Sequence, residues 1–316
     1  MAVLTRQPER TRPPRTRVHR SRPRTLAIGM VAPAVVVLVA ILGYPLGRLI
    51  VLALQEYGSR AVFTGDAPFV GLANITGVLG DGAFWAVLAR TVLFAAVVVV
   101  ALMLGGLGLS HLLSRVSGWA RLATTVCLVL VWAMPMVAAA LMWQWLFQPQ
   151  YGVVNWMVSQ LHVFGDQTAS DWLAHPTSGM VLIMLLVVWK GLPFVAMTLY
   201  AAQSQIPAEL YEAAGLDGAT GLAAFRTITA PLLRPVLTVV ALLEIIWSVN
   251  SFTPIWVLTQ GGPNGQTTTL GVYSFLTAFA RTDYGVGAAI ALLTVLLLAA
   301  VAASYVRRLT RQGELA

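Results

Sequence analysis

Charged residues are scarce in this sequence: Asp, Glu, Lys and Arg make up 10% of the 316 residues, whereas 58% are hydrophobic. Soluble domains typically have about 25% charged and about 45–50% apolar residues. So little charge excludes an ordinary soluble protein, because a polar surface could not be built from it. The composition therefore indicates a membrane protein.

Cysteine and histidine are scarce as well. Cys127 is the only cysteine, which excludes an intrachain disulfide framework, and we interpret it as a small core residue. The four histidines are scattered at His19, His111, His162 and His175, without the spacing typical of metal ligands. We expect no metal site in this chain.

Catalytic motifs are missing too. The sequence has no G-x-x-x-x-G-K-[ST] phosphate loop, no G-x-S-x-G elbow and no H-E-x-x-H pair, so we do not expect the chain to hydrolyse ATP by itself. Asp166 and Asp171 lie near His162 and His175 in one loop and could form an acid/base group. Loop carboxylates are usually just solvated, and we expect no catalytic residue.

Long apolar runs stand in place of these features. A bilayer core of about 30 Å needs about 20 apolar residues per spanning helix. Runs of this length predict an all-α integral membrane protein with six transmembrane helices, near 26–47, 86–109, 122–147, 179–202, 235–258 and 285–306. We interpret most tryptophans in and between these runs as interface-belt or packing residues: Trp132, Trp143, Trp145, Trp156, Trp172, Trp189 and Trp256.

The positions of the basic residues predict the orientation, because Lys and Arg are disfavoured in short translocated loops. With both ends in the cytoplasm, the inner segments hold fifteen of the 20 basic residues, eight of them before Thr25. The outer loops hold only Arg60 and Arg281. We therefore expect both termini to be cytoplasmic.

Three regions follow from this topology. Residues 1–25 are expected to form a disordered basic arm, residues 26–306 the six-helix membrane domain, and residues 307–316 a cytoplasmic tail. The net charge of +8 comes largely from the arm. Next to a first span, such an arm is expected to contact anionic membrane lipid and not nucleic acid.

A short polar segment interrupts the apolar sequence between the fourth and fifth spans, in a cytoplasmic loop at 203–234. It reads Glu209-Leu-Tyr-Glu-Ala-Ala-Gly-Leu-Asp-Gly218-Ala and is followed by Ile-Thr-Ala-Pro231. Pro207 suits a first helical position, and a carboxylate two residues later favours a helix start. We expect a short helix here.

The rest of the loop predicts a surface for a partner. Ala213 and Ala214 leave a side-chain-poor face that another protein could approach closely. Gly218 permits a turn that a residue with a Cβ would resist. A second short helix at 222–229 is expected to lead to Pro231 and the fifth span.

These residues resemble the coupling loop of ABC importer permeases, in which Glu-Ala-Ala is followed by Gly and then by Ile-x-x-Pro. Ala230 departs from the family, which usually has Leu before this proline. The resemblance covers roughly residues 26–306 and the compact six-helix form. Further motifs resemble the carbohydrate branch in the right order: Phe69-Val-Gly-Leu-Ala-Asn74, Tyr151-Gly-Val-Val-Asn155-Trp, Trp189-Lys-Gly-Leu-Pro193-Phe, Val257-Leu-Thr-Gln-Gly-Gly-Pro263 and Tyr284-Gly-x-Gly-Ala-Ala289.

The resemblance implies a type I ABC importer permease fold in the bacterial cytoplasmic (inner) membrane. Its implied partners are a second permease subunit, a cytoplasmic ATPase dimer that binds ATP and Mg, and an extracytoplasmic solute-binding protein. This chain would bind no cofactor itself and would move solute by alternating access. The residues that match the ATPase-coupling loop are Glu209, Glu212, Ala213, Ala214, Asp217, Gly218 and Pro231.

Ionisable groups deep in a membrane are costly unless they are paired or functional. Lys190, the only lysine, and Glu244 each lie about 11 residues and about 16 Å into their spans, near the bilayer midplane. Arg48 and Arg90 lie nearer span ends, and we expect their side chains to extend toward the interface.

In the family, solute is held between the fourth and fifth spans, so the resemblance implies a solute site there. Carboxylate, hydroxyl and aromatic groups suit a sugar, oligosaccharide or amino sugar. Two alternatives stay open: a glycerol phosphate bound through Lys190, and a structural ion pair between Lys190 and Glu244. The substrate-pathway candidates are Lys190, Phe194, Glu244, Ser248 and Ser251, with Asn250 second because it lies about 100° off the neighbouring serine on a helix.

Two other classes of protein are alternatives. A membrane enzyme acting on lipid-linked sugars would need a carboxylate pair at the membrane surface, for which only Asp166 and Asp171 are available. A secondary transporter driven by an ion gradient is favoured by an inverted repeat, and we see none in the sequence.

Overall fold

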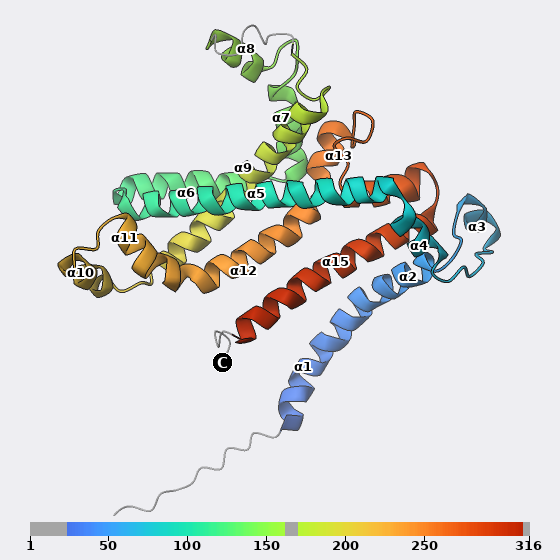
Figure 1. Cartoon of the computed structure of the whole chain (residues 1–316), viewed down its shortest axis with the longest axis horizontal. Coiled ribbons are helices and arrows are strands. Elements are labelled where there is room, and N and C mark those ends of the chain that lie inside the picture. Colours follow the sequence, from blue (N-terminus) through green and yellow to red (C-terminus); the bar gives the residue numbers. More distant parts are fainter. Residues whose placement is uncertain (1–23, 162–169, 312–316) are drawn as a thin grey trace, which may run out of the picture. The chain divides into compact units, whose positions relative to one another are not determined.

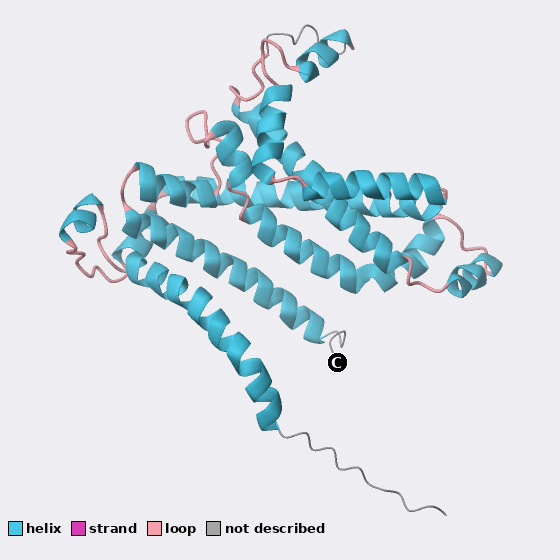
Figure 2. Cartoon of the chain, turned by 180° about the vertical axis from the view of Figure 1, so that it is seen from behind, coloured by secondary structure: helices cyan, strands magenta, loops and turns pink. Residues whose placement is uncertain are grey.

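The computed structural model describes residues 24–161 and 170–311, and within these ranges helices joined by loops and turns make up the chain (Figure 2). No β-strand occurs in the described part; two isolated bridges join Gln55 to Phe69 and Gly58 to Asp283. The all-α class is therefore confirmed. The basic arm to residue 23, the loop residues His162 and Asp166, and the last five residues of the tail lie outside the described residues.

The chain divides into two compact units, residues 1–48 and 49–316. The described part of the first unit holds α1 (Arg24–Leu38), the π-helical turn η1 (Val39–Gly43) and the start of α2 (Tyr44–Ala53). These elements form one apolar helix from Ile28 to Ala53, 26 residues long. The first predicted span is confirmed, although its helix continues beyond residue 47.

Long apolar helices dominate the second unit (Figure 1). Among the described residues, five helices of the chain are long and apolar enough to cross a membrane, or six if one bent pair counts as a single span. This agrees with the six predicted spans; the cytoplasmic placement of both termini stays a prediction. The long helices of this unit are α5 (Gly82–Arg115), α9 (Pro176–Gln203), α12 (Ala230–Val249) and α15 (Tyr284–Arg311).

Shorter helices connect them. On the chain before α5 lie α3 (Ser59–Thr64) and α4 (Ala73–Gly80), and α8 (Val153–Gln160) precedes α9. The segment between α9 and α12 holds α10 (Ala208–Leu216), α11 (Leu222–Ala224) and the π-helical turn η2 (Phe225–Thr229). Between α12 and α15 lie α13 (Thr253–Thr259), α14 (Leu270–Phe275) and η3 (Leu276–Ala280).

The third span is broken, whereas the sequence predicted one helix at 122–147. It consists of α6 (Gly118–Ala133) and α7 (Met136–Leu146), bent by 100°. Pro135 lacks the N–H that a continuous helix needs, and its ring pushes Met134 out of the helical region, to φ −63° and ψ 132°. Cys127 on α6 is exposed, so its interpretation as a core residue was wrong.

The fifth span also differs from the predicted single helix at 235–258. The expected helix at 222–229 forms as α11 and η2, but it runs directly into α12, so the fifth span begins earlier than predicted. It is interrupted after Val249, and α13 begins at Thr253. Pro254 at the start of α13 has no N–H to donate back to the preceding turn.

The core of the second unit is built on the contact between α5 and α9, which cross each other in Figure 1. Phe94, Val98 and Leu102 of α5 are completely buried against α9 residues that include Ile183 and Leu186. Gly105 and Gly106 let the backbone of α5 approach that of α9 closely near Val195. Small residues at helix crossings are typical of membrane proteins, where lipid supplies no hydrophobic drive for association.

Because the two helices approach closely here, the loss of stability on replacing a glycine of α5 should depend on which glycine is replaced. A Cβ on Gly106 would lie 2.5 Å from Cγ1 of Val195, whereas one on Gly108 would meet nothing within 4 Å. We expect Gly106→Leu to lower the free energy of unfolding by about 1–3 kcal/mol. Thermal unfolding of the purified protein in detergent measures this. Gly108→Leu is the matched control, and equal loss in both variants would contradict the packing shown here.

Candidate solute cavity and coupling segment

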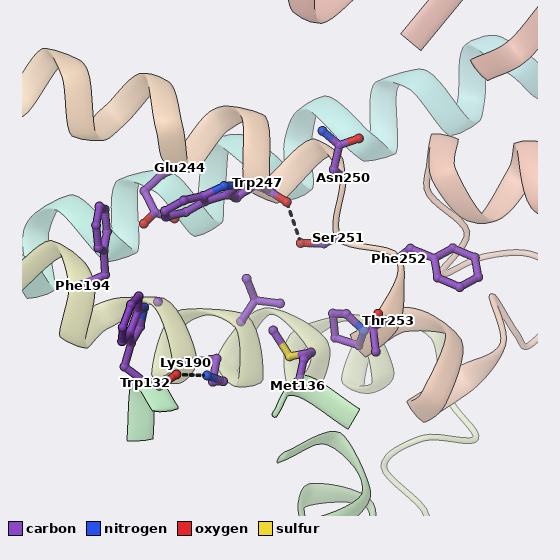
Figure 3. Close-up of a pocket in the computed structure, with 14 residues that line it drawn as sticks. Trp132, Met136, Lys190, Phe194, Glu244, Trp247, Asn250, Ser251, Phe252 and Thr253 are labelled. Carbon is purple, nitrogen blue, oxygen red and sulfur yellow. Dashed lines mark hydrogen bonds between the residues drawn. The ribbon is translucent and has the colours of Figure 1, made fainter. Parts of the chain in front are cut away.

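A cavity of about 430 Å³ lies between α9 and α12, at the breaks in the third and fifth spans (Figure 3). This volume is within the range of about 300–1,000 Å³ typical of small-molecule sites. All six substrate-pathway candidates line it: Lys190, Phe194, Glu244, Ser248, Asn250 and Ser251. The tertiary structure thus places around one cavity the candidates that the resemblance implied on the fourth and fifth spans.

Glu244 and Ser248 are buried polar groups without partners. Glu244 is 3% exposed and Ser248 1% exposed, and they lie one helical turn apart on α12. Neither Oε1 of Glu244 nor Oγ of Ser248 has a hydrogen-bond partner. Leaving such a group unsatisfied costs about 1–3 kcal/mol. Both groups can therefore accept hydrogen bonds from a molecule in the cavity, and the hydroxyl can also donate one.

Lys190 is not paired with Glu244. Its Nζ donates to the carbonyl oxygen of Trp132 at 2.6 Å, on the opposite side of the cavity (Figure 3). In this conformation, therefore, α9 is not joined to α12 by a structural ion pair between Lys190 and Glu244. The ammonium group instead holds the end of α6.

Aromatic rings form part of the cavity wall. Phe194 of α9 and Trp247 of α12 meet edge to face, with their ring centroids 5.0 Å apart. Trp132 lies across from them (Figure 3). Our interpretation of Trp132 as a belt or packing residue missed this position, and Trp247 was not singled out, although it lies three residues after Glu244 and so near the same helical face.

The break after α12 places two further polar side chains at the cavity. The predicted fifth span at 235–258 placed Ser251 on the same helix as Glu244 and Ser248, but Ser251 lies beyond the end of α12. Its Oγ donates to the carbonyl of Trp247 at 3.1 Å, and Nδ2 of Asn250 donates to the carbonyl of Ile246 at 2.9 Å. Asn250 nevertheless lines the same cavity.

The predicted coupling loop at 203–234, here called the coupling segment, contains the short exposed helix that the sequence predicts, α10. Pro207 lies immediately before this helix. It ends at Leu216 and is followed by Gly218, whose φ is 78°, and the N–H of Ala219 donates to the carbonyl of Ala214 at 2.8 Å. This left-handed ending is one that glycine adopts without strain. Of the seven matched coupling residues, only Ala214 is half-buried. The other six are exposed: Glu209, Glu212, Ala213, Asp217, Gly218 and Pro231.

Two features connect the coupling segment to its surroundings. The hydroxyls of Tyr211 and Thr229 are 2.9 Å apart, which joins α10 to the start of the fifth span. Leu216 is 91% exposed, and Leu210 and Leu222 are exposed as well. Apolar side chains gathered on a polar loop are typical of a protein interaction site.

Other candidates from the sequence have structural roles. Oδ1 of Asp171 accepts hydrogen bonds from the N–H groups of Leu173 and Ala174, as in a turn. Nη1 of Arg90 donates to the carbonyls of Gly265 and Thr268, at 3.0 and 2.9 Å. Within residues 24–161 and 170–311 no group of three or more His, Cys, Asp or Glu could hold a metal ion.

Several apolar spans, a cavity with polar side chains between two of them and an exposed segment that joins those two helices define a membrane transport subunit. Residues 103–312 match the family of binding-protein-dependent transport system inner membrane components. The chain belongs to this family, which confirms the resemblance to ABC importer permeases and the inner-membrane location. It is a transport component and not an enzyme, and a solute-binding protein is its partner.

Relatives and a solved structure agree. The chain is 38% identical over 288 residues to the diacetylchitobiose uptake system permease protein DasB of Streptomyces coelicolor, covering 90% of this chain and 87% of that one. It is 33% identical to the sulfoquinovosyl glycerol transport system permease protein SmoG of Agrobacterium fabrum, covering 90% of each. A bacterial alginate ABC transporter with a pentasaccharide-bound periplasmic protein has a chain of the same fold, with TM-score 0.76, 18% identity and coverage of 91% and 94%.

We expect the protein to become more stable when the charge of Glu244 is removed. In Glu244→Gln a neutral amide replaces a buried carboxylate that lacks a partner for Oε1, and we expect the free energy of unfolding to rise by about 1 kcal/mol. Thermal unfolding in detergent without solute measures this. The exposed Glu212→Gln is the control and should change little. A clear loss of stability in Glu244→Gln would show that the carboxylate has a stabilising partner.

Proposed function

We propose that this chain is the transmembrane permease subunit of an ATP-driven, binding-protein-dependent importer for a carbohydrate. One observation carries the proposal: the cavity with its unpartnered Glu244 and Ser248 lies between the two helices that the exposed coupling segment connects. A solute site and a partner site on the same pair of helices are what transport driven by a separate protein requires. The uptake of diacetylchitobiose and of sulfoquinovosyl glycerol by the relatives supports a sugar-containing solute.

The chemistry of the cavity favours a neutral or amino sugar over an anionic one. A buried carboxylate can accept hydrogen bonds from hydroxyl or ammonium groups but would repel a phosphate. The nearby ammonium group of Lys190 is already bonded to a backbone carbonyl. Trp132, Phe194 and Trp247 offer apolar ring faces for stacking against a sugar. A glycerol phosphate therefore fits this site less well.

Two further partners complete the proposal. A second permease subunit, different from this one, would close the open side of the cavity, where the rings of Trp132 and Trp247 are exposed. A cytoplasmic ATPase dimer, which binds ATP and Mg, would receive α10 in a cleft. Closure of the ATPase would then move α10 with α9 and α12, because the coupling segment is continuous with both helices and Tyr211 bonds Thr229.

The coupling role predicts that charge reversal on α10 disrupts assembly with the ATPase. We expect Glu212→Lys to reduce the amount of ATPase subunit that purifies with the permease by about tenfold, because a repulsive charge at an interface costs more than 1.4 kcal/mol. Quantitative immunoblotting of the detergent-purified complex measures this.

Glu56→Lys is the matched control, since Glu56 is exposed and lies outside the coupling segment. This variant should keep the ATPase. Equal retention in Glu212→Lys and the parent would contradict a coupling role for α10.

The solute site predicts a loss of uptake in Glu244→Gln. Amide acceptors bind hydroxyl groups more weakly than carboxylates do, so uptake of a neutral disaccharide such as diacetylchitobiose should slow by about tenfold. Proteoliposomes holding the complete transporter and its solute-loaded binding protein measure the rate. Glu56→Gln serves as the control. Unchanged uptake in Glu244→Gln, with equal protein reconstituted, would place the solute elsewhere.

A further inference from the structure

The break in the third span leaves a backbone carbonyl without its helical partner. In a continuous helix the carbonyl of Trp132 would accept the N–H of Met136. Here α6 ends at Ala133, and the chain turns by 100° before Met136 begins α7. An unpaired carbonyl is poorly tolerated at membrane depth, because no water is present to satisfy it. The break therefore needs a hydrogen-bond donor from another part of the chain.

Lys190 supplies that donor. It lies on α9, and its Nζ is 2.6 Å from the carbonyl oxygen of Trp132. The end of α6 also carries the negative pole of the helix dipole, which favours a cation at this place. Lys190 is the only lysine among the 20 basic residues of the chain. A long, flexible ammonium group is thus placed where the broken helix has its unpaired acceptor.

The break forms part of the cavity wall. Trp132 near the end of α6 and Met136 at the start of α7 both line the cavity, and Lys190 lies beside them (Figure 3). Glu244 lies on the other wall, and its Oε1 has no partner. The ammonium group therefore bonds the helix end although an unpaired carboxylate borders the same cavity.

We propose that Lys190 is a positioning residue, which holds the broken third span so that Trp132 and Met136 face the cavity. It acts through the Trp132 carbonyl and is neither a ligand of the solute nor the ion-pair partner of Glu244. The consequence for transport rests on the proposed function, but the geometry of the break can be tested without any solute.

The experiment measures whether Met136 reaches the cavity. Cys127→Ser removes the single, exposed cysteine, and Met136→Cys then provides one thiol at the break. Alkylation by N-ethylmaleimide is followed in membranes that contain the complete transporter, with no solute added. Because the break loses its donor, we expect Lys190→Met to slow alkylation by about tenfold. Lys190→Arg keeps a cationic donor and should restore the rate to within about twofold of the parent.

Glu244→Gln is the control, because it removes the carboxylate and leaves the Trp132 carbonyl bonded. Its alkylation rate should stay within about twofold of the parent. An unchanged rate in Lys190→Met, or no rescue by Lys190→Arg, would overturn the proposal. An equal slowing in Glu244→Gln would also overturn it, in favour of an ion pair.

Protein amounts are compared by immunoblot before alkylation. If Lys190→Met does not accumulate in the membrane, Lys190→Gln is measured instead, with its neutral amide donor one atom shorter. An intermediate rate in that variant supports the positioning role, and a rate equal to the parent overturns it. The experiment does not measure uptake. Its result can therefore be interpreted even if the proposed function in sugar import is wrong.

Discussion

The absence of water in the bilayer is the constraint on which the structure depends, because every backbone N–H and C=O at membrane depth needs a partner within the protein. Continuous helices meet this requirement by themselves. Where the helices end or break, cationic side chains supply donors: Lys190 at the end of α6 and Arg90 at the loop before α14. In the predicted inner loop after the second span, Arg121 likewise bonds the carbonyls of Leu113 and Val116. These few charged side chains thus provide hydrogen-bond partners for backbone carbonyls.

Glu244 and Ser248 carry side-chain oxygens that this network of partners leaves unsatisfied. Both are buried, and each has an oxygen without a partner, on a helix face that borders a cavity. Groups that cost stability in the empty protein are expected at sites that have to bind something else. The aromatic rings of Phe194 and Trp247 beside them add apolar surface. The cavity thus combines hydrogen-bond acceptors with ring faces, which is a suitable environment for a polyhydroxylated solute.

The two walls of the cavity are also the two helices that emerge at the coupling segment. The segment is short, its helix α10 is exposed, and the bond between Tyr211 and Thr229 links it to the fifth span. A force on α10 would therefore reach α9 and α12 with little intervening flexible chain. The tight packing of α5 on α9 provides the frame against which such a movement would occur.

Composition and periodicity alone determined the membrane class, the approximate spans, the short helix at Glu212 and the two helices that carry Lys190 and Glu244, because these depend on local apolar length and on turn-forming residues. The breaks at Pro135 and after Val249 were missed, although prolines mark both, since a proline in a membrane span bends or breaks it according to which donors its neighbours offer. Only the tertiary structure decided that Lys190 serves the Trp132 carbonyl, that Glu244 stays unpaired, and that Trp132, Trp247 and Asn250 border the same cavity. The physical reason is that these outcomes depend on how helices distant in sequence pack, and no local pattern encodes that.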